Sequence, residues 1–333
     1  MTQLPVDDAR ALGRAYGVVV ESVEALELGS VNSNFRIRTD DGTVLFGRLY
    51  EEQGEDGARG ELELVRALAA AGVPVAAPLP VVGKAQPAHA GKPFALFPWL
   101  ESEILCQGRV TTEHCRSVGS ALAKVHLASP FLPRLGAGRF GPEHLLVRLE
   151  RVKASGRSEF FADAELIRES IERYRAARDP ALPSGVVHGD LFRDNVLGKL
   201  GGGAGALPTS ETAAPPTHET GALLALLDFE SAFHGPFLYD VLVTMAAWCF
   251  RDAFDLELAR ALGAGYQAER PLEAGEKRAL RVEGALGMLR FATTRITDYS
   301  LRVPKGAKPV RDYRRFLARL SFIEAGALDG VFG

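Results

Sequence analysis

Short runs in which hydrophobic and polar positions partly alternate occupy the first hundred residues. The runs SNFRIRT (33–39) and TVLFGRLY (43–50) are joined by Asp40, Asp41 and Gly42. Alternation on both sides of an Asp-Gly turn is typical of a β-hairpin. We therefore expect two antiparallel strands near the start of the chain.

The pattern then changes to helical spacing. Leu62, Val65 and Leu68 recur three residues apart, and Gly72 and Pro74 end the run. The run KPFALFPWLESE (92–103) predicts a buried strand that continues into a polar connector. Beyond it, four long segments carry apolar residues at spacings of three and four and predict helices: 114–129, 158–178, 238–250 and 279–301.

This order predicts an α+β fold with two lobes. We expect a small strand-rich lobe over residues 1–100, a connector near 97–103, and a larger helical lobe over 104–333. Residues 199–221 are mostly Gly, Pro, Ala and Thr and cannot build a core, so they predict a flexible insert. Short apolar runs flank the insert on both sides, which favours a strand, an excursion and a returning strand.

Composition narrows the class of protein. Among 333 residues, 47% are hydrophobic and 24% charged, and the formal charge is −3. These values indicate a folded globular protein and argue against nucleic-acid binding by bulk charge. The sequence shows no secretory leader pattern and no apolar run of membrane-spanning length. Cys106, Cys115 and Cys249 lie far apart, so we expect reduced thiols in the cytoplasm, and neither a disulfide framework nor a cysteine metal site.

One polar stretch, VVHGDLFRDNV (186–196), predicts chemistry. Asp190 is placed to accept a proton from a substrate hydroxyl, while Asn195 and Asp228 supply the hard oxygen atoms that suit Mg²⁺. An Asp, an Asn five residues later and an Asp-Phe pair after a strand match the order in kinase catalytic loops. For His188 we favour a hydrogen-bonded structural role, because Asp190 already fills that of the base.

The same residues carry a family resemblance. HGDLFRDNVL (188–197) and LLDFESAFHGPFLYDVLVTMAAWCF (226–250) resemble the aminoglycoside phosphotransferase and choline kinase superfamily, whose fold is protein-kinase-like. GSVNSNFRI, GYQAERPLEAGEKRAL, LRFATTRITDYSL and KPVRDYRRFLARL are similar to the bacterial type II homoserine kinases. The resemblance implies ATP and Mg²⁺ as cofactors, Asp190 as catalytic base, and Asn195 and Asp228 as magnesium ligands. It also suggests that Asp240 is a buried acceptor that braces the catalytic loop.

The resemblance further implies a nucleotide site. The segment 29–34 takes the place of the loop that covers the phosphates, with Gly29, Ser30, Asn32 and Ser33 as contacts.

Where the resemblance leads us to expect a lysine on the third strand, this chain has Arg48. Its guanidinium group is positively charged and can donate two parallel hydrogen bonds to a phosphate. The alternative is that Arg48 is a surface residue of the strand. Its proposed partner is Glu61, with Glu63 as the competing choice. The adenine is expected at residues 97–101, near Phe97, Trp99 and Leu100. Phe97 and Trp99 are equally consistent with core between the lobes.

An amino-acid alcohol as acceptor requires a cation for its carboxylate. Arg290 and Arg295 lie in an apolar segment and are candidates, and Asn32 and Asn34 are further ones. Ion pairs of the two arginines with Glu283 or Asp298 are the alternative, because an unpaired buried charge is costly.

The leading hypothesis is an ATP-dependent phosphotransferase acting on the hydroxyl of L-homoserine in threonine synthesis, with a small-molecule partner and no nucleic acid or membrane. A related kinase for another amino alcohol, choline or an aminoglycoside is the first alternative. The second is a catalytically silent kinase-like protein, which Arg48 in place of lysine favours and the intact Asp190, Asn195 and Asp228 oppose. Nothing in the sequence indicates an oligomeric state.

Overall fold

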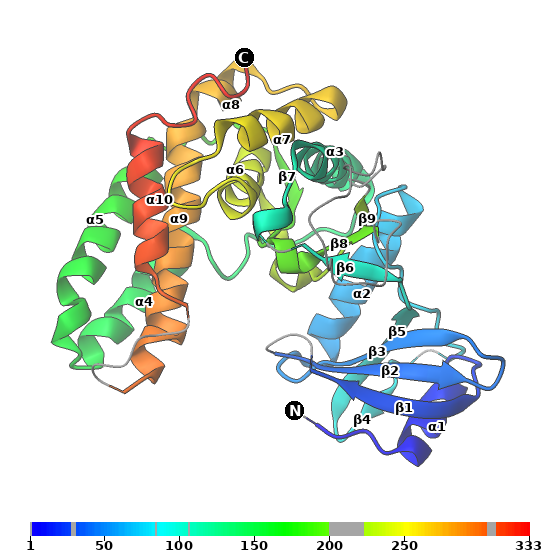
Figure 1. Cartoon of the computed structure of the whole chain (residues 1–333). Coiled ribbons are helices and arrows are strands. Elements are labelled where there is room, and N and C mark those ends of the chain that lie inside the picture. The colour runs from blue at the N-terminus through cyan, green and yellow to red at the C-terminus, as the bar shows by residue number, and fades with distance from the viewer. Residues whose placement is uncertain (1, 28–30, 84, 106, 200–222, 305–310) are drawn as a thin grey trace, which may run out of the picture. The chain divides into compact units, whose positions relative to one another are not determined.

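The structure is a computed structural model that describes residues 2–27, 31–83, 85–105, 107–199, 223–304 and 311–333 (Figure 1). The chain forms two compact units. The first comprises Met1–Glu103, Phe131–Pro133 and Leu224–Glu230, and the second comprises Ile104–Pro130, Arg134–Leu223 and Ser231–Gly333. Gly29, Ser30 and the expected insert, apart from Lys199, lie outside the described residues.

The first unit is built on a five-stranded antiparallel sheet with strand order β1-β2-β3-β5-β4. The predicted hairpin is confirmed, because Ser33 pairs with Leu49 and Arg38 with Val44 across a turn in which Gly42 has φ of 85°. The strands are β1 (Val20–Leu26), β2 (Ser33–Thr39), β3 (Val44–Leu49), β4 (Ala88–His89) and β5 (Lys92–Pro98).

A helix covers each face of this sheet. Leu12 of α1 (Val6–Arg14) packs with Phe35 and Leu49 on one face. Leu62 of α2 (Glu55–Ala70) packs with Ala95 on the other. The predicted helix is thus confirmed as α2, and Gly72, with φ of 78°, follows its C-cap residue Ala71.

The second unit is mostly helical. Helix α9 contacts α4, α5, α6 and α10 along its length, and so forms the centre of this unit (Figure 1). The short strand β10 pairs with β7 in antiparallel register, Phe233 with Val187 and Pro236 with Ser184.

The helices are α3 (Thr112–Ala128), α4 (Pro142–Ala154), α5 (Phe161–Ala177), α6 (Phe237–Trp248), α7 (Leu256–Glu269), α8 (Ala274–Arg278), α9 (Leu280–Asp298) and α10 (Arg314–Glu324). The remaining strands of the chain are β6 (Ser102–Ile104), β7 (Ser184–Val187), β8 (Val196–Lys199), β9 (Leu223–Leu226) and β10 (Phe233–Pro236).

Glycines bring α3 and α7 into backbone contact. A Cβ atom on Gly119 of α3 would lie 2.1 Å from the carbonyl oxygen of Leu262, and one on Gly265 of α7 would lie 2.0 Å from that of Arg116. Any side chain at either position therefore forces the helices apart. Among the helices that the structure describes, none combines the length and the apolar character needed to cross a bilayer.

Replacing Gly119 by alanine is expected to destabilise the fold. The methyl group collides with backbone that cannot rotate away, so we expect Gly119→Ala to lower the free energy of unfolding by about 3 kcal/mol. Gly60→Ala is the matched control, because Gly60 is an exposed residue inside α2 with open space around its Cα. It should raise the free energy of unfolding by up to about 1 kcal/mol. Urea unfolding of both variants tests this, and an unchanged Gly119→Ala midpoint would contradict the proposed close approach.

Candidate active site

The loop after β7 holds Asp190 in a defined backbone conformation. Gly189 has φ of 76°, and a Cβ atom there would lie 2.9 Å from the carbonyl oxygen of Ser231. The backbone N–H of Phe192 and the side-chain Nδ2 of Asn195 both donate to the Asp190 carbonyl oxygen, at 2.7 and 2.8 Å. The carboxylate of Asp190 is about one-third exposed, at 35%. The Asp190 carboxylate is therefore accessible to solvent, while its backbone is fixed by Gly189 and by the hydrogen bonds from Phe192 and Asn195.

A buried carboxylate on α6 holds this loop from behind. Asp240 is fully buried and accepts hydrogen bonds from the backbone N–H of His188 at 2.6 Å and of Gly189 at 2.8 Å. Burial acts to raise the pKa of Asp240, but hydrogen bonds from His126 and from the loop outweigh it and leave the pKa below its ordinary value. The carboxylate therefore stays ionised and fixes the loop, as the sequence suggested.

His126 of α3 completes the support of Asp240. Its Nε2 lies 3.2 Å from Asp240 Oδ2, and its Nδ1 lies 2.7 Å from the hydroxyl of Tyr266 on α7. Since an ionised carboxylate can only accept, Nε2 carries the proton and Nδ1 accepts from Tyr266. Neither His126 nor Tyr266 was predicted from the sequence, because 114 positions separate His126 from Asp240 and no local pattern connects them.

The ring of His188 is buried and turned toward its own loop. The backbone N–H of Asp190 donates to His188 Nδ1 at 3.3 Å. This contact agrees with the structural role that we favoured for His188.

Arg290 of α9 contacts the same loop. Its Nη1 donates to the carbonyl oxygen of Gly189 at 2.6 Å and lies 3.4 Å from Asp190 Oδ1. The guanidinium is buried between the rings of Phe140 and Phe291, at 4.4 and 4.0 Å from their centroids. Arg290 therefore orients Asp190 and places a positive charge beside it.

The alternative ion pairs for Arg290 and Arg295 were predicted wrongly. Glu283 is bound by Arg178, at 2.8 and 2.6 Å. Asp298 is bound by Arg148, at 2.9 and 2.8 Å. Both carboxylates are thus committed to other arginines that lie nearer to them.

In the first unit, Arg48 of β3 faces Glu61 of α2. The two side chains are largely buried, and Nη1 lies 3.9 Å from Glu61 Oε1. Glu63 is exposed, so the choice of Glu61 as the partner agrees with the structure. Burial acts to lower the pKa of Arg48, but the charges of Glu61, Asp228 and Glu230 outweigh it and raise the pKa. A surface role for Arg48 is therefore wrong.

Asp228 belongs to the first unit together with Arg48 and Glu61, whereas Asp190 and Asn195 belong to the second. Its φ of 62° lies in the left-handed region, which aspartate tolerates better than most residues but which still carries strain. Such strain at a carboxylate is a feature of functional sites, and the charge of Asp228 acts directly on Arg48.

The strand register places Ser33 and Asn34 of the predicted phosphate-covering segment on different faces of the sheet. Asn34 pairs with Arg48, so both side chains lie on the sheet face toward α2. Ser33 pairs with Leu49 on the face toward α1, where its hydroxyl contacts Glu51 and accepts from the Thr2 backbone N–H at 2.8 Å. Asn32 Oδ1 accepts from the Glu51 backbone N–H at 3.2 Å.

The adenine candidates lie at the end of β5. Phe97 packs edge-on against Phe46, with ring centroids 6.2 Å apart. The guanidinium of Arg36 lies over the Trp99 ring at 4.9 Å, and Trp99 Nε1 donates to Glu101 at 2.9 Å. The carbonyl oxygen of Leu100 accepts from Ser102.

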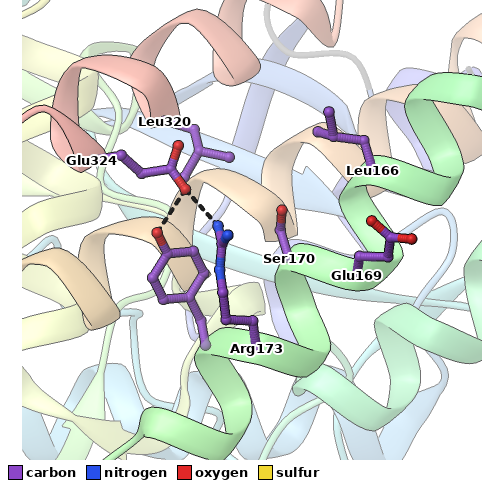
Figure 2. Close-up of a pocket in the computed structure, with 7 residues that line it drawn as sticks. Leu166, Glu169, Ser170, Arg173, Leu320 and Glu324 are labelled. Carbon is purple, nitrogen blue, oxygen red and sulfur yellow. Dashed lines mark hydrogen bonds and ion pairs between the residues drawn. The ribbon is translucent and has the colours of Figure 1, made fainter.

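A surface groove between α5 and α10, with a volume of about 570 Å³, holds none of the predicted site residues (Figure 2). Its main polar groups satisfy one another, because Arg173 and Tyr174 both bind Glu324, at 2.7 and 2.6 Å. The groove is lined by Leu166, Glu169, Ser170, Arg173, Tyr174, Leu320 and Glu324. We therefore take the Asp190 loop of the second unit and the Arg48 face of the first unit as two candidate functional regions.

Glu61 predicts a pH-dependent stability. Its burial raises the pKa from 4.5 to about 7, against the opposing charge of Arg48 and the hydrogen bond from Gln53, while Asp228 and Glu230 raise it further. A raised folded-state pKa stabilises the fold fully below the unfolded value, and this stabilisation is lost as pH rises through 7. The free energy of unfolding of the wild type, compared with that of Glu61→Gln, should fall by up to about 3 kcal/mol between pH 4.5 and 8. Urea unfolding of both proteins across this pH range tests the prediction. A difference in unfolding free energy that does not change with pH would rule out the titration of Glu61 in this range.

The family of the chain follows from comparison with known proteins. The model of the phosphotransferase enzyme family matches residues 22–206 and 217–272, and the gap falls inside the Gly- and Pro-rich segment. A homoserine kinase of Methylobacterium radiotolerans is 35% identical over 90% of this chain and 88% of the relative. One of a Caulobacter species is 32% identical over 94% of this chain and 92% of the relative.

Solved structures share the fold. An amicoumacin kinase has a TM-score of 0.67 at 16% identity, covering 96% of this chain and 94% of that one. Choline kinase from Cryptosporidium parvum has a TM-score of 0.62 at 14% identity, covering 97% and 99%. The predicted fold class is thereby confirmed as the α+β fold of protein-kinase-like phosphotransferases. With the family match over most of its length, the chain belongs to the phosphotransferase enzyme family and is an ATP-dependent kinase.

Proposed function

We propose that this chain transfers the γ-phosphoryl group of ATP to the side-chain hydroxyl of L-homoserine, forming O-phospho-L-homoserine in threonine biosynthesis. Relatives named homoserine kinase that match along most of the chain support this acceptor. The structural observation that carries the proposal is the Asp190 carboxylate, accessible on a loop whose backbone is held by Asp240. The reaction uses ATP, so we place it in the cytoplasm, with a small molecule as partner.

Asp190 acts as the general base. It accepts the proton of the acceptor hydroxyl while that oxygen attacks the γ-phosphorus, and the bond from phosphorus to the bridging oxygen of ADP breaks. Arg290 Nη1, 3.4 Å from Asp190 Oδ1, orients the carboxylate and places a positive charge beside it. In this role Arg290 is a positioning residue.

Asn195 and Asp228 fit Mg²⁺ by their donor chemistry. The Asn195 amide nitrogen is used by the Asp190 carbonyl, which leaves the amide oxygen as a ligand. Mg²⁺ typically takes one or two protein carboxylates with water and substrate phosphates, so a single Asp with an Asn suffices. When bound, the ion neutralises charge on the phosphates. The solved amicoumacin kinase complex contains AMP-PNP and Ca²⁺, a nucleotide analogue with a divalent cation.

Arg48 supplies the cation for the nucleotide phosphates in this proposal. Glu61 orients it, and Asn34 lies on the same face of the sheet. We further propose that the end of β5, with Phe97, Trp99 and Leu100, receives the adenine. Gly29, Ser30 and Asn32 remain predicted phosphate contacts. Ser33 does not support this prediction, because it lies on the opposite face of the sheet from Arg48 and its hydroxyl contacts Glu51 and Thr2.

ADP release by the purified chain with Mg-ATP tests the acceptor. We expect turnover on L-homoserine and little on L-threonine, L-serine, choline or kanamycin. Asp190→Asn should lower kcat by roughly 10²–10⁴-fold, the usual contribution of a general base. Asp194→Asn, an exposed acid in the same loop, is the matched control and should keep full activity. Turnover on choline or kanamycin instead would discard homoserine, and turnover on none would favour the silent alternative.

Arg48 predicts an effect on the nucleotide. Arg48→Met removes a charged hydrogen-bond donor, so KM for ATP should rise roughly tenfold or more, and Arg48→Lys should do so less because it keeps the charge. Arg38→Met on the same strand pair is the control, because Arg38 is exposed. Initial rates at varied ATP measure this. An unchanged KM for ATP in Arg48→Met would remove the residue from the nucleotide site.

A further inference from the structure

Two arginines of the second unit share one aromatic ring. The guanidinium carbons of Arg295 on α9 and of Arg311 lie 5.0 and 5.1 Å from the centroid of the Tyr299 ring. Arg311 Nη1 also donates to the Tyr299 hydroxyl at 3.1 Å. All three side chains are half-buried, so the pair is held in place and still reachable from solvent.

The positive charge of this pair is not neutralised. Within the part of the chain that the structure describes, no carboxylate oxygen lies within 4.0 Å of either guanidinium. Asp298, the nearest acid in sequence to Arg295, is bound by Arg148. Burial and the charge of Arg311 both lower the pKa of Arg295, as expected for two cations held together. Such an arrangement is costly unless an anion joins it.

The pair borders the catalytic loop. Phe192, two residues after Asp190, packs edge-on against Phe291 and Phe316, at 5.0 and 6.4 Å. Arg295 lies over the same Phe316 ring at 6.0 Å. The negative charge of Asp190 also acts on Arg295. Arg295 therefore lies within electrostatic reach of Asp190, and Arg311 lies beside Arg295 on the Tyr299 ring.

Arg290 differs from this pair, although the sequence placed it with Arg295. Its Nη1 is occupied by the Gly189 carbonyl oxygen and by Asp190. Its remaining faces lie on the Phe140 and Phe291 rings. Arg290 is thus bound to the Asp190 loop, and Arg295 and Arg311 are the arginines available to bind a ligand.

We propose that Arg295 and Arg311 together bind the α-carboxylate of the acceptor and make a carboxylate-bearing amino alcohol the preferred substrate. This inference rests on the proposed function. Guanidinium groups match the planar fork of a carboxylate and bind it in bidentate geometry. A nucleotide phosphate offers similar oxygen chemistry, but a cation for it is already present in Arg48 of the first unit. The acceptor carboxylate has no other such cation in our assignment.

The test compares L-homoserine with 3-aminopropan-1-ol, the same amino alcohol without the carboxylate. We expect Arg295→Met and Arg311→Met each to lower kcat/KM for homoserine roughly tenfold to a hundredfold, the effect of losing one charged hydrogen bond. The kcat/KM for 3-aminopropan-1-ol and the KM for ATP should stay unchanged. Unchanged turnover of the truncated acceptor also shows that each variant is folded. Arg260→Met, an exposed arginine on α7, is the matched control.

Each result separates this inference from the proposed function. Homoserine turnover by the wild type with an unchanged substrate preference in both variants overturns the inference alone. A rise in KM for ATP in place of the loss for homoserine assigns the pair to phosphate and also overturns it. No homoserine turnover by the wild type overturns the proposed function and this inference together. Arg295→Lys supplies a second folded variant, which should keep part of the preference because it keeps the charge.

Discussion

The hydrogen bonds of the buried Asp240 carboxylate are the interactions on which the loop of Asp190 depends. The carboxylate receives two backbone N–H groups of the loop and the ring of His126, so the charge is hydrogen-bonded although it has no contact with water. His126 in turn is fixed by Tyr266, and α3 and α7, which carry these two side chains, approach closely only because Gly119 and Gly265 lack side chains. The accessible position of Asp190 is thus set by helix packing that involves no reacting group.

Arg48, Arg290 and the pair of Arg295 and Arg311 lie in three different electrostatic surroundings, and these surroundings indicate their roles. Arg48 faces a buried acid across 3.9 Å, and Arg290 contacts the Asp190 loop. Arg295 and Arg311 form no ion pair with a carboxylate of the described residues. A buried cation with a partner inside the protein is stable without a ligand. A pair of cations without one is stabilised by an anion, so the last of these surroundings is the one that indicates a ligand.

Local patterns predicted much of the fold and the chemistry of the site. The Asp-Gly turn, the spacing of Leu62 and Leu68, and the order of Asp190 and Asn195 are short-range features, and the structure contains the corresponding hairpin, helix and loop. Long-range features could not be predicted from local patterns. The contact of His126 with Asp240, the partners of Arg290 and Arg295 and the position of Arg311 beside Tyr299 depend on how the elements pack. In the same way, the side of the sheet on which Ser33 lies follows from strand register, which the alternation of one strand alone does not fix. Glu61 as the partner of Arg48 and Asp240 as the brace of the loop were predicted from the family resemblance.

An arginine at position 48, where the family resemblance predicts a lysine, suits the burial of this position. Burial lowers the pKa of a cation, and lysine loses its charge far more readily than arginine does. Glu61, with a pKa of about 7, is only partly ionised near neutral pH, so it orients Arg48 without neutralising it fully. The buried Nε of Arg48 also has no hydrogen-bond partner among the described residues. A remaining positive charge and an unused donor suit the phosphate oxygen that we propose as the ligand of Arg48, so a weak acid partner favours this proposed role more than a strong acid would.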